Sequence, residues 1–194
     1  MFINPTIAYY SQDCITTAAQ ALRDDWRLLW EQHVAWTRMT ILSAAFGLPD
    51  LPQVSARLLQ NPDAMGAVMR QFYGDAAAAK FAALIREHLE IAIRLVGAAK
   101  AGDAAAAAQI EKQWYANADE IARFLAGLNP YWPQEAFRAM LHEHLRLTKE
   151  EATAILTGKY QQSIALYDQI ERQALMMADA LTGGILKQFP QMFR

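Results

Sequence analysis

Short breaks that contain Gly or Pro divide this chain into long segments with helical periodicity, and they constrain its fold more than any other feature. The main breaks lie at 47–49, 102–103, 129–133 and 157–158. Between them, apolar residues recur every three to four positions, which is the period of an amphipathic helix. No long run alternates apolar with polar residues, as a half-buried strand would. The pattern therefore predicts an all-α protein.

The breaks also predict how the helices are arranged. Short loops between consecutive helices make those helices antiparallel neighbours. We therefore expect residues 1–194 to form one domain, an antiparallel up-and-down bundle of four to five long helices with short accessory helices. Residues 1–22 would be an N-terminal extension, and 47–75 would be a long connection in which Asn61 caps a short helix. The long helices are expected at about 24–46, 73–100, 104–128, 133–156 and 159–187.

Composition narrows the classes of protein that this chain can belong to. Of its 194 residues, 54% are hydrophobic and 20% are charged, which suits a packed core. The net charge of -2 lacks the basic excess of nucleic-acid binders, so no nucleic-acid partner is expected. A single cysteine, Cys14, excludes an internal disulfide framework and Cys-rich metal sites. There is no secretory signal and no apolar run of about 18 residues, so we expect a cytoplasmic protein without a membrane span.

A polar residue lies near the middle of the apolar stripe of each predicted long helix. His88, Asn117, His144 and Glu171 each lie about 13 or 14 residues from the turns that separate them, or roughly 20 Å at 1.5 Å per residue. Counting therefore places these four side chains at one level of the bundle, facing inward. His33 has the same central place in its own stripe. The stripe expected to face inward in the last helix contains Tyr160, Ile164, Tyr167, Glu171, Ala174, Ala178 and Leu181.

Such a buried layer needs an explanation, because a polar group buried without a partner costs about 1–3 kcal/mol. Three imidazoles and one carboxylate form a suitable ligand set for a divalent transition metal such as Zn, Fe, Mn or Ni. We therefore expect His33, His88, His144 and Glu171 to be metal ligands. The metal would support redox or hydrolytic chemistry on a small molecule, and no further catalytic residue is assigned.

Other polar side chains are expected to orient these imidazoles from outside the ligand set. Asn117, together with Thr37 or Tyr167, has the hydrogen-bonding groups for that role. By contrast, His142 falls on the same side of its helix as Arg138 and Arg146, so we expect it to face solvent.

Two other interpretations of the layer stay open. In the first, the protein is a non-enzymatic helical module whose buried hydrogen bonds only fix helix register, with Glu171 accepting from His88 and His144. In the second, the layer is the polar floor of a pocket for a small organic ligand. A small molecule and a second copy of the chain are the partners that the sequence leaves open. The phosphate-binding, nucleophile-elbow, HExxH and paired ExxH motifs of common enzymes are missing.

A weak internal echo connects two of the predicted helices. Glu87-His88-Leu89 recurs as Glu143-His144-Leu145, and Gly102 and Gly158 each follow their histidine by 14 residues. The echo indicates two helical hairpins of related geometry.

Several longer phrases also resemble a group of uncharacterised bacterial helical proteins. The resemblance covers most of the chain from Trp26 to Pro190 and implies a helical fold, but it implies no activity. The phrases are HVAWTR (33–38), WYANADEIARFL (114–125), NPYW (129–132), EHLRLT (143–148) and YDQIERQALMMAD (167–179).

Overall fold

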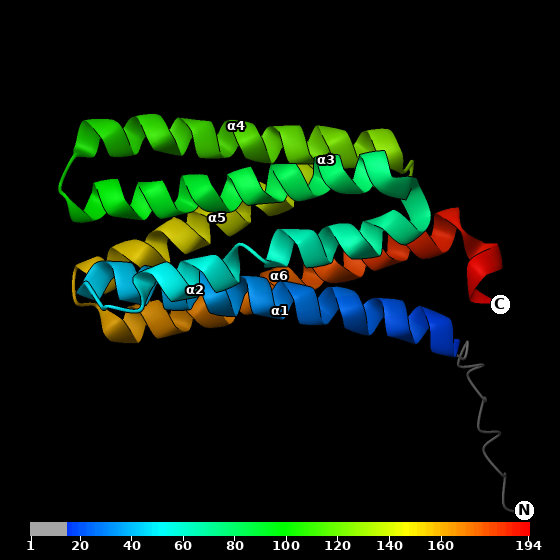
Figure 1. Cartoon of the computed structure of the whole chain (residues 1–194), viewed down its shortest axis with the longest axis horizontal. Coiled ribbons are helices and arrows are strands. Elements are labelled where there is room, and N and C mark those ends of the chain that lie inside the picture. The colour runs from blue at the N-terminus through cyan, green and yellow to red at the C-terminus, as the bar shows by residue number, and fades with distance from the viewer. Residues whose placement is uncertain (1–14) are drawn as a thin grey trace, which may run out of the picture.

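The computed structural model describes residues 15–194, and every regular element in that range is helical (Figure 1). The all-α bundle that the sequence predicts, with four to five long helices, is therefore confirmed. None of the described helices is long and apolar enough to cross a membrane. The elements are α1 (Thr17–Phe46), α2 (Leu51–Leu58), α3 (Asn61–Lys100), α4 (Ala104–Leu128), α5 (Gln134–Leu156), α6 (Tyr160–Gln188) and the 3₁₀ turn η1 (Pro190–Phe193).

Helix α1 begins about seven residues earlier than the periodicity indicated. The side chain of Thr16 caps it by accepting a hydrogen bond from the backbone N–H of Ala19 at 3.3 Å. Residues 17–22, expected in an N-terminal extension, therefore belong to a bundle helix. Residues 1–14 of that expected extension lie outside the described residues.

Helix α3 consists of two antiparallel parts that meet at Gly74. The backbone of Gly74 has φ 76° and ψ 178°, a conformation that is essentially restricted to glycine. Figure 1 shows the chain reversing its direction there. The two parts pack so closely that a Cβ added at Gly66, in the first part, would lie 3.1 Å from the Cβ of Ala82 in the second. The break at Gly74 thus converts one continuous stretch of helix-forming residues into a tight helical hairpin.

The bundle is a ring of three helical hairpins. Helix α1 pairs with the first part of α3, the second part of α3 pairs with α4, and α5 pairs with α6. Neighbouring hairpins meet where α4 packs on α5 and where α6 packs on α1. The short helix α2 packs on α1.

Tight packing also fixes the 129–133 loop between the second and third hairpins. The Trp132 side chain is buried in this loop, and its Nε1 donates to the carbonyl oxygen of Ala180 at 3.2 Å. The indole lies directly against Gly184, where an added Cβ would be 1.9 Å from Nε1. Only glycine at position 184 leaves room for this indole, so the loop is held against α6.

Candidate functional site

The three histidines expected at the bundle centre are all buried, and each forms the same hydrogen bond to the second helix of its hairpin. In every case Nδ1 of the imidazole lies within 3.0 Å of a side-chain amide oxygen. The pairs are His33 with Asn61 (3.0 Å), His88 with Asn117 (2.9 Å) and His144 with Gln173 (3.0 Å).

The amide nitrogen of each pair returns to the histidine's own helix. It donates to the backbone carbonyl four residues before the histidine, which is that of Leu29 (2.8 Å), Leu84 (3.2 Å) or Met140 (2.7 Å). Because the amide NH₂ is committed to this carbonyl, the amide oxygen faces the imidazole, so Nδ1 carries the proton and donates it. We call each unit of histidine, amide and carbonyl a histidine clamp.

The clamped imidazoles are neutral at physiological pH. Burial lowers the pKa of His33 to about 4, and burial together with the neighbouring histidines lowers the pKa of His88 and His144 to about 3. The amide oxygens oppose the shift. With the proton on Nδ1, each ring keeps a lone pair on Nε2.

The three clamps repeat at nearly constant spacing. The amide follows its histidine by 28, 29 and 29 residues. A glycine with positive φ follows each histidine by 14 residues, namely Gly47 (64°), Gly102 (74°) and Gly158 (72°). The echo seen between positions 88 and 144 therefore extends to position 33, and the ring has an approximate threefold repeat.

The histidine rings lie near one another but do not form a ligand cluster in this structure. The ring centroids of His33 and His144 are 5.9 Å apart, and Trp30 packs against both. The His88 ring packs instead on Trp114 at 5.3 Å. Among residues 15–194, no group of three or more His, Cys, Asp or Glu side chains is arranged to hold a metal ion. The metal therefore stays a prediction.

The inward position expected for Glu171 is occupied by Gln173. Glu171 is half-buried near Glu31 on α1, and burial, together with the charge of Glu171, raises the pKa of Glu31. The expected stripe is displaced throughout the first half of α6, where Tyr160 and Ile164 are 54% and 50% exposed. The stripe that is buried there contains Ser163, Leu166, Ile170, Gln173 and Met177. This buried stripe includes two polar residues, Ser163 and Gln173. Hydrophobicity alone therefore favoured the expected stripe, which contains two tyrosines.

Asn61 also has a different role from the one expected. It is the first residue of α3, and its side chain completes a clamp instead of capping the helix. The sequence analysis missed both Asn61 and Gln173 as partners of histidine. The signal that could have found them is spacing, because each follows its histidine by the same 28 or 29 residues as Asn117.

Of the three residues expected to orient the imidazoles, Asn117 lies in a clamp, whereas Tyr167 and Thr37 lie elsewhere. The Arg38 guanidinium lies over the Tyr167 ring, 5.1 Å from its centroid, and forms an ion pair with buried Glu151. Burial raises the pKa of Glu151 to about 7, although Arg38 opposes the shift.

Outside the clamps, His142 is half-buried and contacts Asp119 at 2.7 Å.

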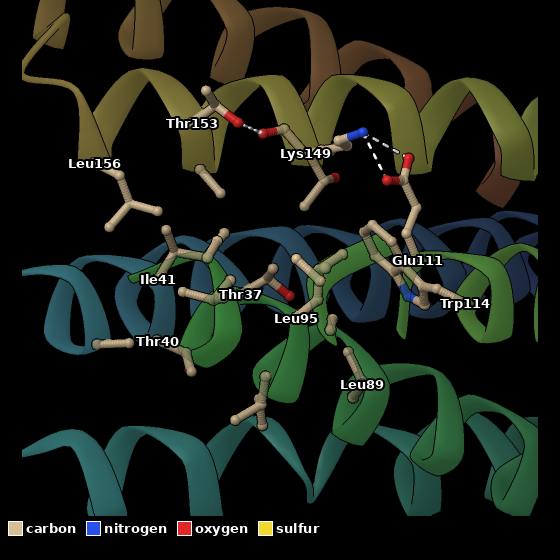
Figure 2. A pocket seen from close by; sticks show the side chains of 18 of the residues that line it. Thr37, Thr40, Ile41, Leu89, Leu95, Glu111, Trp114, Lys149, Thr153 and Leu156 are labelled. Carbon is tan, nitrogen blue, oxygen red and sulfur yellow. Dashed lines mark hydrogen bonds and ion pairs between the residues drawn. The ribbon is translucent and has the colours of Figure 1, made fainter. Parts of the chain in front are cut away.

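A cavity of about 110 Å³ lies immediately beyond the clamps, and we call it the central cavity (Figure 2). Thr37, Ala92 and Thr148, each four residues after a clamped histidine, line it. Its walls are predominantly apolar side chains from α1, α2, α3, α4 and α5. Figure 2 shows Lys149 of α5 paired with Glu111 of α4 at its edge, with Nζ 2.6 and 2.7 Å from the two carboxylate oxygens.

Two buried polar atoms of the cavity lining have no hydrogen-bond partner among the described residues. They are the hydroxyl oxygen of Thr37 and Nε1 of Trp114. Nε1 of Trp26 and Trp30 also lacks a partner, but neither of these residues lines the cavity. Both atoms are fully buried, so the surface that the central cavity presents is predominantly apolar.

Comparison with protein-family models, curated proteins and solved structures finds no match to this chain. Its function therefore has to be inferred from its own residues.

A clamp can be tested by removing its amide. We expect Gln173→Leu to lower the free energy of unfolding by about 1–3 kcal/mol, because it leaves the Nδ1–H of His144 buried without a partner and removes a second hydrogen bond from the carbonyl of Met140. The matched change Glu171→Gln, two residues away, should be neutral or slightly stabilising, since it removes charge beside Glu31. Urea denaturation of both variants measures the difference. Equal destabilisation by the two changes would contradict the placement of Gln173 in the clamp.

The clamps also predict acid sensitivity. Below about pH 6.5 the unfolded chain protonates its histidines, while the folded chain keeps three of them neutral until about pH 3–4. The free energy of unfolding should therefore decrease as the pH is lowered through that window. Glu151 has the opposite effect between about pH 4.5 and 7, because its raised pKa increases stability as the pH is lowered. Three histidines outweigh this one carboxyl group. The free energy of unfolding should be measured from pH 4.5 to 7.5. In His144→Gln its slope against pH should decrease by the equivalent of about one proton taken up on unfolding, and in the control His142→Gln it should decrease less. A pH-independent stability of the wild type would refute the assignment of buried neutral histidines.

Proposed function

We propose that this protein binds a small, predominantly apolar molecule in its central cavity. The observation that carries the proposal is the cavity itself, a space of about 110 Å³ between the helices with predominantly apolar walls, partly open to solvent beside exposed residues such as Ala99 and Thr153. Protein interiors are close-packed, and voids larger than a water molecule are few. An apolar cavity of about 150 Å³ is large enough to hold benzene, and this one is smaller, so it suits a molecule of at most one ring.

The way the cavity is built supports a retained binding site more than a packing defect. On all three clamped helices the residue one turn after the histidine is small, as Thr37, Ala92 and Thr148. Further along the same helices Ala44, Ala99 and Ala152 also line the cavity. Because the clamps hold each histidine helix to its hairpin partner, these helices are not free to close on the space that the small side chains leave.

The charge of the lining indicates an uncharged ligand. Its charged side chains, Lys149 and Glu111, are paired with each other at the edge. An ionised ligand inside would have to compete for one member of this pair or remain unpaired at a high cost in free energy.

Filling the cavity should abolish binding. We expect toluene or benzene to raise the melting temperature of the wild-type protein in proportion to the logarithm of ligand concentration, because the ligand binds the folded state. Ala92→Leu places a larger side chain in the cavity and should remove this shift, whereas Ala83→Leu, on the exposed side of the same helix, should preserve it. Differential scanning fluorimetry and isothermal titration calorimetry provide the measurements. No binding of ring-sized apolar molecules by the wild type, or equal binding by Ala92→Leu, would contradict the proposal.

The clamped histidines support a second candidate function, the binding of a divalent transition metal. Metal-ligating histidines usually donate their other ring N–H to a carbonyl or carboxylate oxygen, and the three clamps supply such an acceptor at Nδ1. The nitrogen that would bind a metal is therefore Nε2 of His33, His88 and His144.

Metal content discriminates between the two candidates. If the histidines bind metal, the purified protein should contain close to one Zn, Fe, Mn or Ni ion per chain, and a chelator should lower its melting temperature by mass action. His88→Ala combined with His144→Ala should remove the metal, while His142→Ala should not. Elemental analysis gives the stoichiometry. Metal-free protein whose melting temperature does not respond to added Zn, Fe, Mn, Ni or Co would eliminate this candidate.

A further inference from the structure

We infer that the ligand of the central cavity is an unbranched aliphatic chain with an uncharged polar group at one end, such as a primary alcohol. The chain lies along the bundle, with its methyl end next to the clamps and its polar group at the opening of the cavity. This inference rests on the proposed function and names the chemical class of its ligand.

The cavity is elongated along the bundle. On each of the four long helices that line it, the first and last lining residues are 7 to 10 positions apart, or about 10–15 Å at 1.5 Å per residue. These helices run along the length of the bundle, so the four spans lie beside one another (Figure 1). A volume of about 110 Å³ distributed over such a length forms a narrow channel. The spans are 37–44 on α1, 89–99 on α3, 107–114 on α4 and 148–156 on α5.

Alanines line this channel at successive levels. Counted from the clamp residue of the same helix, they lie 4 to 11 positions away, which corresponds to about 6–16 Å along the helix. Ala92 is nearest to the clamps, and Ala152 lies in the middle of the channel. Small side chains at each level leave space along the whole channel instead of one compact void, and this shape suits a chain more than a ring. The alanines farthest from the clamps are Ala44, Ala99 and Ala107.

The two ends of the channel differ in their access to water. Next to the clamps, Leu89, Trp114 and Thr148 are buried. Toward the helix ends, Ala99 and Thr153 are exposed. A polar group at the exposed end keeps its hydrogen bonds with water, whereas the same group next to the clamps would lose them. The polar end of the ligand therefore lies at the opening.

Two isomeric alcohols, unbranched 1-pentanol and compact 2,2-dimethyl-1-propanol, test the shape of the ligand. We expect 1-pentanol to bind the wild-type protein about 10-fold more tightly, because its chain extends two carbons further and each buried CH₂ group raises affinity about fourfold. Ala152→Leu, in the middle of the channel, should weaken 1-pentanol binding and remove this preference. The matched change Ala139→Leu, on the exposed side of the same helix, should preserve both. Calorimetry measures the dissociation constants.

The orientation of the ligand is tested on the wild-type protein, which also keeps the test valid if Ala152→Leu does not fold. Pentane-1,5-diol carries a second hydroxyl that would lie at the closed end, so it should bind about 5- to 100-fold more weakly than 1-pentanol. In nuclear Overhauser spectra, the methyl protons of 1-pentanol should be close to Ala92, and the CH₂ protons beside its hydroxyl should be close to Ala99.

The outcomes separate this inference from the proposed function. If neither the alcohols nor benzene bind, the proposed function itself fails. If benzene binds while 1-pentanol does not, or if the compact isomer binds as tightly as 1-pentanol, binding in the cavity stands and the unbranched chain is refuted. Equal binding of the diol, or the reverse pattern of Overhauser contacts, refutes the polar end at the opening.

Discussion

The structure depends on burying three imidazoles without charging them. A neutral ring buried without partners would lose its hydrogen bonds with water, and each clamp replaces one of them with an amide oxygen on the neighbouring helix. The amide then bonds back to the helix that carries the histidine. This exchange works only when histidine and amide lie at the same level. Each clamp therefore fixes the register of two antiparallel helices, a specificity that apolar packing alone provides less sharply.

The central cavity follows from this arrangement. The clamps hold the helices in pairs, while the residues one turn beyond the histidines are too small to fill the space between the pairs. The buried polar layer and the apolar cavity therefore both result from the same arrangement of helices. The layer fixes the helices, and through His88 it also holds the indole of Trp114 in the cavity wall.

Much of this construction could be predicted from the sequence because helices have a regular rise. Counting from the turns placed His88 and Asn117 at one level, and the structure joins them by a hydrogen bond of 2.9 Å. The same counting failed by two residues in α6, where Ser163 and Gln173 interrupt the buried stripe and make it look less apolar than its neighbour. The cavity could not be predicted, because its volume depends on how far the small side chains of several helices stand apart. Nor could the free hydroxyl of Thr37, since the sequence does not distinguish it from Thr40 or Thr148.

The first and third hairpins are packed against each other, but within residues 15–194 no loop connects α6 directly to α1. The contact of α6 with α1 is reinforced by the Arg27–Asp179 ion pair, and the hydroxyl of Thr16 donates to the carbonyl of Phe193 at 2.9 Å. The described part of the chain thus forms a closed ring with one noncovalent seam, at which its two ends are neighbours. A circularly permuted chain, joined across this seam and opened at the 101–103 turn, would retain all three clamps. The architecture therefore depends on the contacts between its helices and not on which turn carries the chain break.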